Sequence, residues 1–456
     1  MQATVQQQKN YRYYGTLRRL LNRKAGPNIR KILDKTHPAD MAQILSYFAA
    51  EEKRAILRYA ESDKRRAEIL REFPLEAAAE LVVLMKIPEA VAIILEMSAD
   101  DQADLLGSLD EQHAHDIIAA MPKDESDDVQ ELLRYDENSA GGIMNPDVVA
   151  IHLDSTIAEA IKVVQTLEDV DMIFYLYVVD DHGSLCGVLS LRRLVTSKPE
   201  TPIKNIMDPN VVSVRTEEDQ EDVARLVTRY DFLAIPVVDD TNNLVGAVTV
   251  DDVIDVIAEE ATEDFLKMAG AGEEQEQNAS PLRHVMNRAP WLFAALLGGV
   301  VTSLVIRNFE YTLSRFLPLA AFIPVITGMA GNVGTQSLAV VVRGLATRQI
   351  KIKQAWQTIS NEILVGVMLG CIYGAILGSV GFWQFSSSTP MPLNLALAVG
   401  TATATAMLAA TLVASSIPLM FARINVDPAV ATGPFVTTTI DIIGVSIYFT
   451  VVNLLV

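Results

Sequence analysis

The last third of the chain is a series of long apolar stretches, and this feature constrains the fold more than any other. Hydrophobic spans follow one another from Trp291, at about 291–306, 316–342, 357–384, 393–421 and 428–455. A helix needs about 20 apolar residues to cross the roughly 30 Å hydrocarbon core of a bilayer, and most of these spans are long enough. The sequence therefore predicts a five-helix α transmembrane domain at 289–456, in contact with the lipid bilayer.

Two acids are placed in the fifth apolar run. A charged side chain at bilayer depth costs about 2.5–3.5 kcal/mol or more unless it faces protein or water, so such residues mark ion or substrate pathways. If one regular helix carried Asp427 and Asp441, they would share a face about 21 Å apart. Thr437 adds a hydroxyl between them, and Pro434 would free a backbone carbonyl one turn earlier. We predict a wet pathway here, although a buried acid satisfied by a neighbouring hydroxyl is the alternative.

The second apolar span carries polar side chains near its centre. Glycines at 328, 331 and 334 allow helices to approach closely. Asn332 and Gln336 add amide groups at the same depth. Close helix packing would explain the glycines but not the two amides together, so we assign Asn332 and Gln336 to the predicted pathway.

Charge is distributed unevenly along the chain. The whole chain carries a net charge of −20, but residues 34–288 hold 53 acidic and 22 basic residues, a net charge of −31. Such a block repels nucleic acid and anionic lipid and favours bound cations, so we expect divalent cations and no nucleic acid as partners. The segment 1–27 is basic, and we expect a solvated amphipathic helix around Thr16–Lys24, with contact to anionic lipid headgroups as the alternative.

The soluble part divides into two predicted domains of different class. Residues 28–135 read as short amphipathic helices broken by prolines, which predicts an all-α, superhelical N-terminal domain. Residues 136–262 contain a duplication, because Ile143–Val149 recurs as Ile206–Val212. Each copy, 136–200 and 201–262, has the pattern strand, helix, strand, turn, strand, helix.

This duplication resembles the tandem cystathionine-β-synthase (CBS) domain, an α/β regulatory module. The resemblance implies that an adenine nucleotide such as ATP binds at a Ser/Thr-x-x-Asp near the end of a repeat. The second copy has that motif at Thr249 and Asp252, whereas the first copy ends with Arg193 in place of the acid. We therefore expect nucleotide at the second copy in preference to the first.

A strongly acidic helix leaves the second copy and should end near residue 268. Asp252, Asp255, Glu259 and Glu263 are spaced 3, 4 and 4 residues apart, so they stack on one helix face, with Glu260 and Asp264 beside them. Like charges at this spacing cost a few tenths of a kcal/mol per pair, and a bound cation would relieve them. A solvated acidic face is the alternative. Residues 263–288 are expected to form a connecting helix and a linker, with the polar stretch 270–280 flexible.

The distribution of basic residues predicts the orientation. The start of the chain lacks the apolar core of a signal peptide, so we expect the N-terminal domains in the cytosol. Basic residues then flank the predicted cytoplasmic ends of the spans more often than the outer ends. With five spans, the C-terminus should face the periplasm or the exterior of the cell.

Taken together, these motifs resemble the MgtE family of magnesium channels. The specific signals are Gly-Met-x-Gly-Asn-x-Gly-x-Gln in the second span and Asp-Pro-Ala…Gly-Pro…Thr-Thr…Asp in the fifth. The resemblance implies a homodimer in the bacterial inner membrane, with its pore between the second and fifth helices and with negative feedback by cytosolic Mg²⁺. It implies that Asp441 selects the ion, that Asp427 lies at the inner end of the pore, and that regulatory Mg²⁺ binds at Asp252, Asp255, Glu260, Glu263 and Asp264. Asp101 lies near the ligands of the family's N-terminal domain.

Other classes of protein fit less well. An ATP-driven pump would need a phosphate-binding Gly-x-x-x-x-Gly-Lys-Ser/Thr motif, which the spans lack. A membrane enzyme would need a catalytic constellation at bilayer depth, where only Asp441 is found, so we do not expect an enzyme. A CBS-regulated carrier for another divalent cation or solute stays open, as do channel against carrier and Mg²⁺ against Co²⁺, Ni²⁺ or Mn²⁺.

Overall fold

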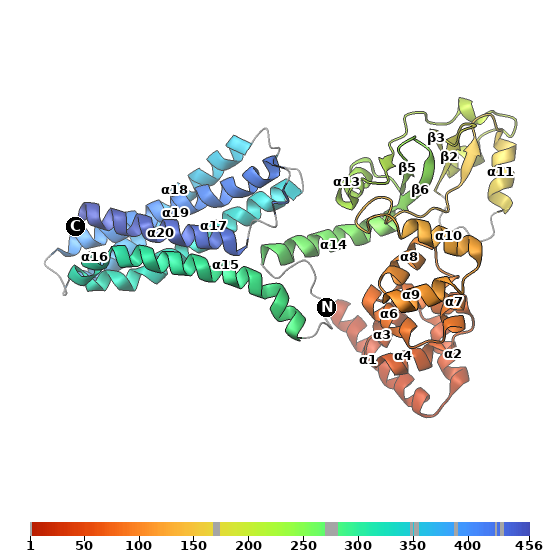
Figure 1. Ribbon diagram of the computed structural model, residues 1–456, viewed down its shortest axis with the longest axis horizontal. Helices are drawn as coiled ribbons and strands as arrows, with labels where there is room; N and C mark the ends of the chain where they lie inside the picture. Colours follow the sequence, from red (N-terminus) through yellow and green to blue (C-terminus); the bar gives the residue numbers. More distant parts are fainter. Residues whose placement is uncertain are drawn as a thin grey trace. The chain divides into compact units, whose positions relative to one another are not determined.

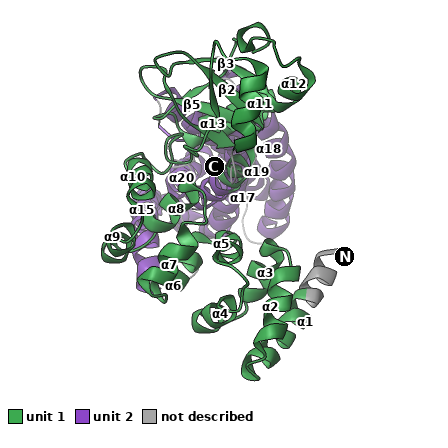
Figure 2. Ribbon diagram, turned by 90° about the vertical axis from the view of Figure 1, so that its right-hand side faces the viewer, with its two compact units in different colours: residues 1–258 green, residues 259–456 purple. Residues whose placement is uncertain are grey.

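The structure is a computed structural model that describes residues 2–166, 174–269, 281–346, 350, 355–386, 391–424, 426–428 and 433–456, with side chains from Asn10 onward. The chain forms two compact units, residues 1–258 and 259–456, shown in different colours in Figure 2. The predicted linker at 270–280 lies outside the described residues.

Unit 1 begins with a stack of short helices (Figure 1). Each helix packs mainly against the next but one along the chain, so α3, α5, α7 and α9 form one row and α4, α6, α8 and α10 form another. This arrangement confirms the predicted superhelical domain. Prolines in the first turn start several of these helices, because proline has no N–H to lose there. The helices are α1 (Gln2–Asn22), α2 (Gly26–Lys35), α3 (Pro38–Leu45), α4 (Ala50–Leu57), α5 (Asp63–Arg71), α6 (Leu75–Val83), α7 (Ile87–Ile94), α8 (Ala99–Gly107), α9 (Glu111–Ile118) and α10 (Lys123–Leu132).

The expected solvated helix around Thr16–Lys24 is part of α1, which packs against this stack. Leu17 is fully buried in the core of unit 1, and the Asn10 side-chain amide donates to Gln43 Oε1 at 2.8 Å. The prediction of a solvated helix was therefore wrong for its apolar face. Burial of the leucine explains the difference, because it removes apolar surface from water.

The duplicated region forms two small sheets of the same design. In each sheet the first strand pairs parallel with the second, and the second pairs antiparallel with the third. Both sheets carry an irregularity at the same place, between Val178 and Val179 and between Val237 and Val238. The predicted order is confirmed by β1 (Ala150–His152), α11 (Ile157–Thr166), β2 (Tyr175–Val179), β3 (Leu185–Ser190) and α12 (Leu191–Thr196), followed by β4 (Val214–Arg215), α13 (Gln220–Tyr230), β5 (Ala234–Val238), β6 (Leu244–Thr249) and α14 (Val250–Met268).

The two copies are interleaved. Asn145, in the segment before β1, bridges to Ala247 on β6, and Asp208 of the second copy bridges to Val188 on β3. Gly246 is required at this crossing, because a Cβ there would lie 2.8 Å from the Asn145 carbonyl oxygen. The second copy also shares one continuous core with the helical stack, while the first copy has a core of its own.

Unit 2 contains, among the described residues, five helices long and apolar enough to cross a membrane, at Pro281–Asn308, Leu317–Leu345, Ala355–Phe385, Pro392–Arg423 and Pro434–Leu455. The number predicted from the sequence is confirmed. The first helix begins at Pro281, ten residues before the predicted span, and includes Pro290. The elements are α15 (Pro281–Asn308), α16 (Glu310–Arg315), a 3₁₀ turn at Leu317–Phe322, α17 (Ile323–Ala346), α18 (Ala355–Phe385), α19 (Pro392–Arg423) and α20 (Pro434–Leu455).

The fifth helix begins later than predicted, and this changes the relation between the two acids. Asp427 lies in non-helical backbone before α20, whereas Asp441 lies within it. The two residues therefore do not share one helix face. Pro434 explains the difference, since proline starts a helix readily and disfavours helical backbone at the preceding Gly433. At this position Pro434 also frees no helical carbonyl, so that part of the prediction was wrong.

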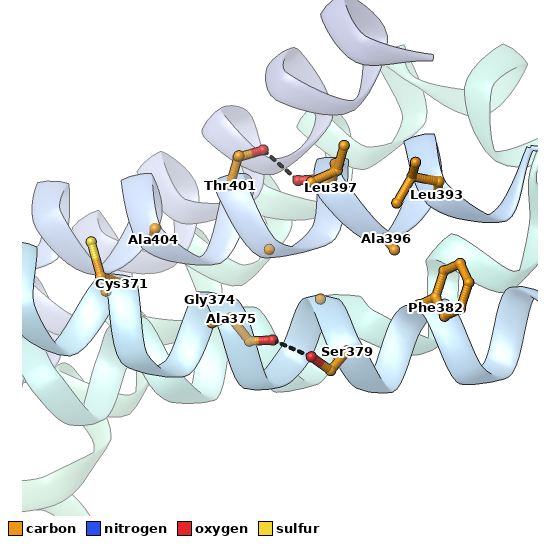
Figure 3. Close-up of a pocket in the computed structure, with 13 residues that line it drawn as sticks. Cys371, Gly374, Ala375, Ser379, Phe382, Leu393, Ala396, Leu397, Thr401 and Ala404 are labelled. Carbon is orange, nitrogen blue, oxygen red and sulfur yellow. Dashed lines mark hydrogen bonds between the residues drawn. The ribbon is translucent and has the colours of Figure 1, made fainter.

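The helices α18 and α19 approach each other unusually closely. A Cβ on Gly374 would lie 2.6 Å from the Gly400 carbonyl oxygen, and one on Gly370 would lie 2.8 Å from that of Ala404. Small residues along this contact also line a hollow of about 580 Å³ (Figure 3). The hydroxyls of Ser379 and Thr401 in its wall donate to carbonyls of their own helices. This hollow is apolar and contains none of the predicted pathway residues.

Candidate functional site

The glycine-rich part of α17 packs against α20, antiparallel to it. Gly334 faces the side chain of Ile440, and one turn away the position of a Cβ on Gly444 lies 3.8 Å from Ala330 Cβ. The absence of side chains at these glycines lets the two helices approach closely. Asp441, which follows Ile440, therefore lies level with the centre of α17.

Asp441 is partly buried, and its carboxylate has no hydrogen bond or ion pair among the described residues. An acid in such a position usually has a protein, ion or water partner, because an isolated charge at bilayer depth is costly. The arrangement leaves the carboxylate available to a cation. It does not support the alternative reading, in which a neighbouring hydroxyl satisfies a buried structural acid.

The predicted polar residues of α17 lie on one exposed face of the single chain. Asn332, Thr335 and Gln336 are exposed, while the neighbouring Val333 and Gly334 are buried in the unit. The amides thus point away from the core of their own chain. Among the described residues no hydrogen bond joins these side chains to Asp441 within one chain.

The threonines of α20 bond to their own helix. Thr437 Oγ1 lies 3.3 Å from the Gly433 carbonyl oxygen and 3.2 Å from that of Pro434, to which it donates. Its oxygen lone pairs still face outward from that bond and can accept from water or contact a cation. Thr437 is partly buried and lies one helical turn before Asp441, so its assignment to the pathway stays a prediction.

At the end of α14 three acids surround one lysine. Lys267 Nζ lies 3.1 Å from Asp427 Oδ2 and also pairs with Glu263. Burial lowers the pKa of Lys267, but its hydrogen bonds to Glu263 and Asp427 outweigh burial and raise it. Burial, and then the Asp427 charge, raise the pKa of Asp264. The sequence analysis assigned Glu263 and Asp264 to the acidic helix and Asp427 to the inner end of the pore, and it missed Lys267, the lone basic residue in the last turn of that helix, which pairs with Glu263 and Asp427.

A second acidic group lies in unit 1, where α8 meets the start of α14. Asp252 Oδ2 accepts a hydrogen bond from Thr249 Oγ1 at 2.5 Å, and Asp100 lies close enough to repel it. Burial is the main reason that the pKa of Asp252 is raised to about 7, with the charges of Asp100 and Asp251 adding to it. Burial also raises the pKa of Asp100, one of whose oxygens has no partner among the described residues.

Asp101 is on the edge of this group. Its Oδ2 accepts from Ser98 Oγ at 2.8 Å and lies 3.6 Å from Arg71. Burial, then the neighbouring Asp100, raise the pKa of Asp101 to about 6. The sequence reading chose Asp101 from this acidic run and missed Asp100, the more buried of the two, because nothing in the run distinguishes them.

The other predicted metal ligands are spread along α14. Asp255 and Glu259 are exposed and Glu260 is partly buried. No group of three or more His, Cys, Asp or Glu side chains within the described part of the chain converges closely enough to hold a metal ion.

The two candidate nucleotide motifs differ in the hydrogen bonds that their side chains make. The Thr249 hydroxyl is engaged by Asp251 and Asp252. In the first copy, Arg193 Nη1 donates to the Ile206 carbonyl oxygen at 2.9 Å, so this side chain is tied to the backbone. In the second copy the Asp252 carboxylate accepts from Thr249 through Oδ2, whereas the first copy has an arginine at the corresponding position.

Comparisons with known proteins agree with this domain order. Family models match as "Divalent cation transporter" at residues 323–451, as "MgtE intracellular N domain" at 36–138, and as "CBS domain" at 140–200 and 203–259. The magnesium transporter MgtE of Enterococcus faecalis is 40% identical over 328 residues, which are 72% of this chain and 71% of the relative. The chain belongs to the MgtE family. The MgtE of Thermus thermophilus is 39% identical over 331 residues, 72% of each chain.

Solved structures of the soluble region are also similar to unit 1. A crystal structure of the cytosolic domain of the Mg²⁺ channel MgtE in complex with ATP is 36% identical and has a TM-score of 0.51. It covers 53% of this chain and 99% of the solved one. The soluble part of a magnesium transporter is 31% identical, with a TM-score of 0.50, and covers 55% of this chain and 99% of the other. The helical stack and the CBS pair are thus an arrangement that members of the MgtE family share.

Proposed function

We propose that this protein conducts Mg²⁺ across the bacterial inner membrane, along a path lined by α17 and α20 of two copies. The observation that carries the proposal is the partly buried carboxylate of Asp441, which lies beside the glycine-rich part of α17 and has no hydrogen bond or ion pair among the described residues. Mg²⁺ takes oxygen ligands and gives up its water reluctantly, so a few carboxylates, hydroxyls and amides around a wide hydrated path suit it. Membership of the MgtE family supports Mg²⁺ as the cargo.

The exposed amides of α17 support a homodimer. Polar side chains at bilayer depth face protein or water and seldom face lipid, and no other element of the same chain covers Asn332 or Gln336 among the described residues. Closed two-fold symmetry is the commonest way for a second copy to cover such a face. It would bring a second Asp441 to the same axis and double the charge on the path.

The orientation follows from charge and from the family. We infer that unit 1 is in the cytosol and that α20 ends on the periplasmic or outer side. The excess of basic residues at the inner ends of the spans supports this. Asp427 would then lie at the cytosolic end of the path, next to the end of α14.

We infer further that the acids of α14 and Asp101 sense cytosolic Mg²⁺ and close the path by negative feedback. At low Mg²⁺ the uncompensated carboxylates repel one another, which favours an open arrangement of the domains. At high Mg²⁺ hydrated ions bridge carboxylates and favour a compact, closed form. The raised pKa values of Asp101 and Asp252 support this, since they reflect buried acids that gain from a nearby cation.

The decisive experiment measures Mg²⁺ uptake into proteoliposomes. We expect Asp441→Asn to fold and insert but to transport Mg²⁺ at least about tenfold more slowly, because the path loses its charge at nearly constant shape. Glu310→Gln, which removes an exposed charge of the same unit at the start of α16, is the matched control. Uptake by Asp441→Asn at the parent rate would refute the assignment of the path. Competition by Co²⁺, Ni²⁺ and Mn²⁺ in the same assay tests the alternative of a carrier for another cation.

A nucleotide is a second proposed ligand. The structure of a related cytosolic domain was solved with ATP, and the CBS pair is the part of this chain suited to adenine nucleotides. Because the two motifs differ, we expect one ATP per chain or none, with Thr249 and Asp252 as the candidate site. Calorimetry of the full chain with ATP, compared with Asp252→Ala, tests this. Two equivalent sites per chain would contradict it.

A further inference from the structure

The face of α20 that meets α17 ends in a buried tyrosine. Ile440 packs on Gly334, and one turn later Gly444 faces Ala330. Tyr448 follows after one more turn and is fully buried. Residues four apart on a helix are neighbours on its surface, so Ile440, Gly444 and Tyr448 form one α17-facing stripe of α20.

The hydroxyl of Tyr448 bonds outside its own helix. It donates to the Leu319 carbonyl oxygen at 2.8 Å, in the 3₁₀ turn that precedes α17, and Leu319 is fully buried as well. A phenylalanine would fill nearly the same space with no polar group to satisfy. A buried hydroxyl has lost its water and stabilises a protein only through the hydrogen bond that it makes. The bond therefore adds direction to a contact that an apolar ring alone would leave free to turn.

Two further contacts hold this end of α20 from other sides. The ring of Phe449 stacks on that of Phe309, with centroids 4.9 Å apart and ring planes at 9°. Thr312 Oγ1 donates to Asn453 Oδ1 at 2.6 Å. At 3.6 residues per turn, Phe449 and Asn453 lie about 100° and about 140° around the helix from Tyr448. Contacts in three directions fix the rotation of this end of the helix.

The rest of the α17-facing stripe is apolar and less directional. At Gly334 and at Gly444 the two helices meet through a glycine on one side, so a small turn of α20 breaks no hydrogen bond there. Asp441 follows Ile440, about 100° further around the helix, and any turn of α20 swings its carboxylate sideways. The direction of the carboxylate thus depends on the fixed end, which lies two turns, or about 10 Å, further along the axis.

We propose that Tyr448 is a positioning residue for the ion path, because its bond to Leu319 holds α20 at the rotation that turns Asp441 toward the path. This inference rests on the proposed function, in which Asp441 is the acid that selects the ion. Tyr448 acts through the helix that carries Asp441. Because the turn that holds α20 also begins α17, the two helices can still tilt together about this end.

The first test measures the reactivity of a thiol introduced by Asp441→Cys, in a chain that also carries Cys186→Ser and Cys371→Ser. A positively charged methanethiosulfonate is confined to water, so it reports whether this thiol faces the wet path. We expect Tyr448→Phe to slow its reaction in proteoliposomes by about three- to tenfold, the effect of one lost hydrogen bond between membrane helices. Tyr373→Phe, on an exposed face of α18, is the matched control and should leave the rate unchanged.

Mg²⁺ uptake is the second readout, measured with the Asp441 carboxylate in place. Tyr448→Phe should lower uptake per inserted protein by about three- to tenfold. Thr312→Val removes the other hydrogen bond at nearly constant shape and should act in the same direction, less strongly. It carries both measurements should Tyr448→Phe fail to insert. A merely structural role would lower the unfolding temperature or the amount of inserted protein while the introduced thiol reacted at the parent rate, and that result would overturn the proposal.

The outcomes separate this inference from the proposed function. If Asp441→Asn abolishes uptake while Tyr448→Phe changes neither uptake nor thiol reactivity, the ion path stands and the positioning role is wrong. A faster thiol reaction with Tyr448→Phe would also overturn it, because the bond would then turn the side chain away from water. If Asp441→Asn transports at the parent rate, the path assignment fails and the positioning role fails with it.

Discussion

The two ends of α14 carry similar acids in different surroundings. At its start, Asp252 is held by the Thr249 hydroxyl and faces the like charge of Asp100. At its end, Glu263 and Asp427 share the ammonium group of Lys267. The first group depends on a proton or an added cation for neutrality, whereas the second contains a cation of its own. Acidic composition alone therefore does not identify a cation sensor, because one lysine beside an acid supplies the positive charge that a bound cation would otherwise supply.

The largest effect should come from removing acids along the whole helix. With Asp252→Asn, Asp255→Asn, Glu260→Gln and Glu263→Gln combined, we expect the Mg²⁺ concentration that closes the path to rise by about a hundredfold. A switch from 1:99 to 99:1 needs about 5.5 kcal/mol of differential binding, and these ligands would supply much of it. Currents across a Mg²⁺ series measure it, with limited proteolysis as a second readout. Closure at the parent concentration would show that these acids are a solvated surface.

The next largest effect is expected from a substitution at the start of α14 alone. The pKa of Asp252 is raised to about 7 in the folded state, above its unfolded value near 3.9, so its ionisation destabilises the fold. The protonated Asp252 side chain makes its full contribution to the free energy of unfolding below about pH 4, and this contribution is lost as the pH rises through 7. In a chelator, Asp252→Asn should therefore unfold like the parent at pH 4 but be more stable by about 2 kcal/mol at pH 8, a value reduced for partial exposure. Thermal unfolding across pH measures this, and equal stability at both pH values would refute it.

A smaller effect is expected at the other end. Lys267→Met leaves Glu263 and Asp427 without their ammonium partner and should weaken the anchoring of the end of α14 by about 1–2 kcal/mol, between the values for exposed and buried ion pairs. Proteolysis near residue 268 in a chelator should become faster, and Mg²⁺ should restore protection. Lys267→Arg keeps the charge and is the control. If Lys267→Met is cut at the parent rate without Mg²⁺, the ion pair does not anchor the helix.

The smallest effect is expected for Glu89, an acid of unit 1 that is already paired with arginines. Hydrogen bonds from Arg58 are the main cause that lowers the pKa of Glu89 to about 2, and Arg54 adds to them. Because the folded pKa is depressed, its stabilisation is present above about pH 4.5 and is lost as the pH falls through 2. Glu89→Gln should cost about 1 kcal/mol at pH 7, given the exposure of Arg58, and almost nothing at pH 2. The Mg²⁺ concentration that closes the path should be the same in Glu89→Gln as in the parent. A changed concentration would show that an acid already paired with arginines also takes part in sensing Mg²⁺.

Most of the fold could be predicted from the hydrophobic pattern of the sequence and from its internal repeat. The five membrane helices follow from the lengths of the apolar spans, and the CBS pair follows from the repeated Ile-Met-Asx-Pro segment. The start of α20 was missed because regular spacing between Asp427 and Asp441 was given more weight than Pro434, whose preference for the first turn was readable in the sequence.

The partners of the site residues could not be read in the same way. Asp100 meets Asp252 and Lys267 meets Asp427 across about 150 residues or more of chain, as the numbering shows. A single sequence can identify candidate site residues, but it does not show which distant residues they contact in the fold.

The close contact of α18 with α19 limits how unit 2 can change shape. Where carbonyl oxygens lie within about 3 Å of a would-be Cβ, only glycine positions can face the neighbouring backbone. Gly370, Gly374 and Gly378 face such carbonyl oxygens and recur every fourth residue, so sliding one helix by a single residue would drive a larger side chain against that backbone. The next matching register lies a full repeat away, about 6 Å along the axis. The two helices should accordingly move as one stiff pair, which leaves tilting and rotation to α15, α17 and α20.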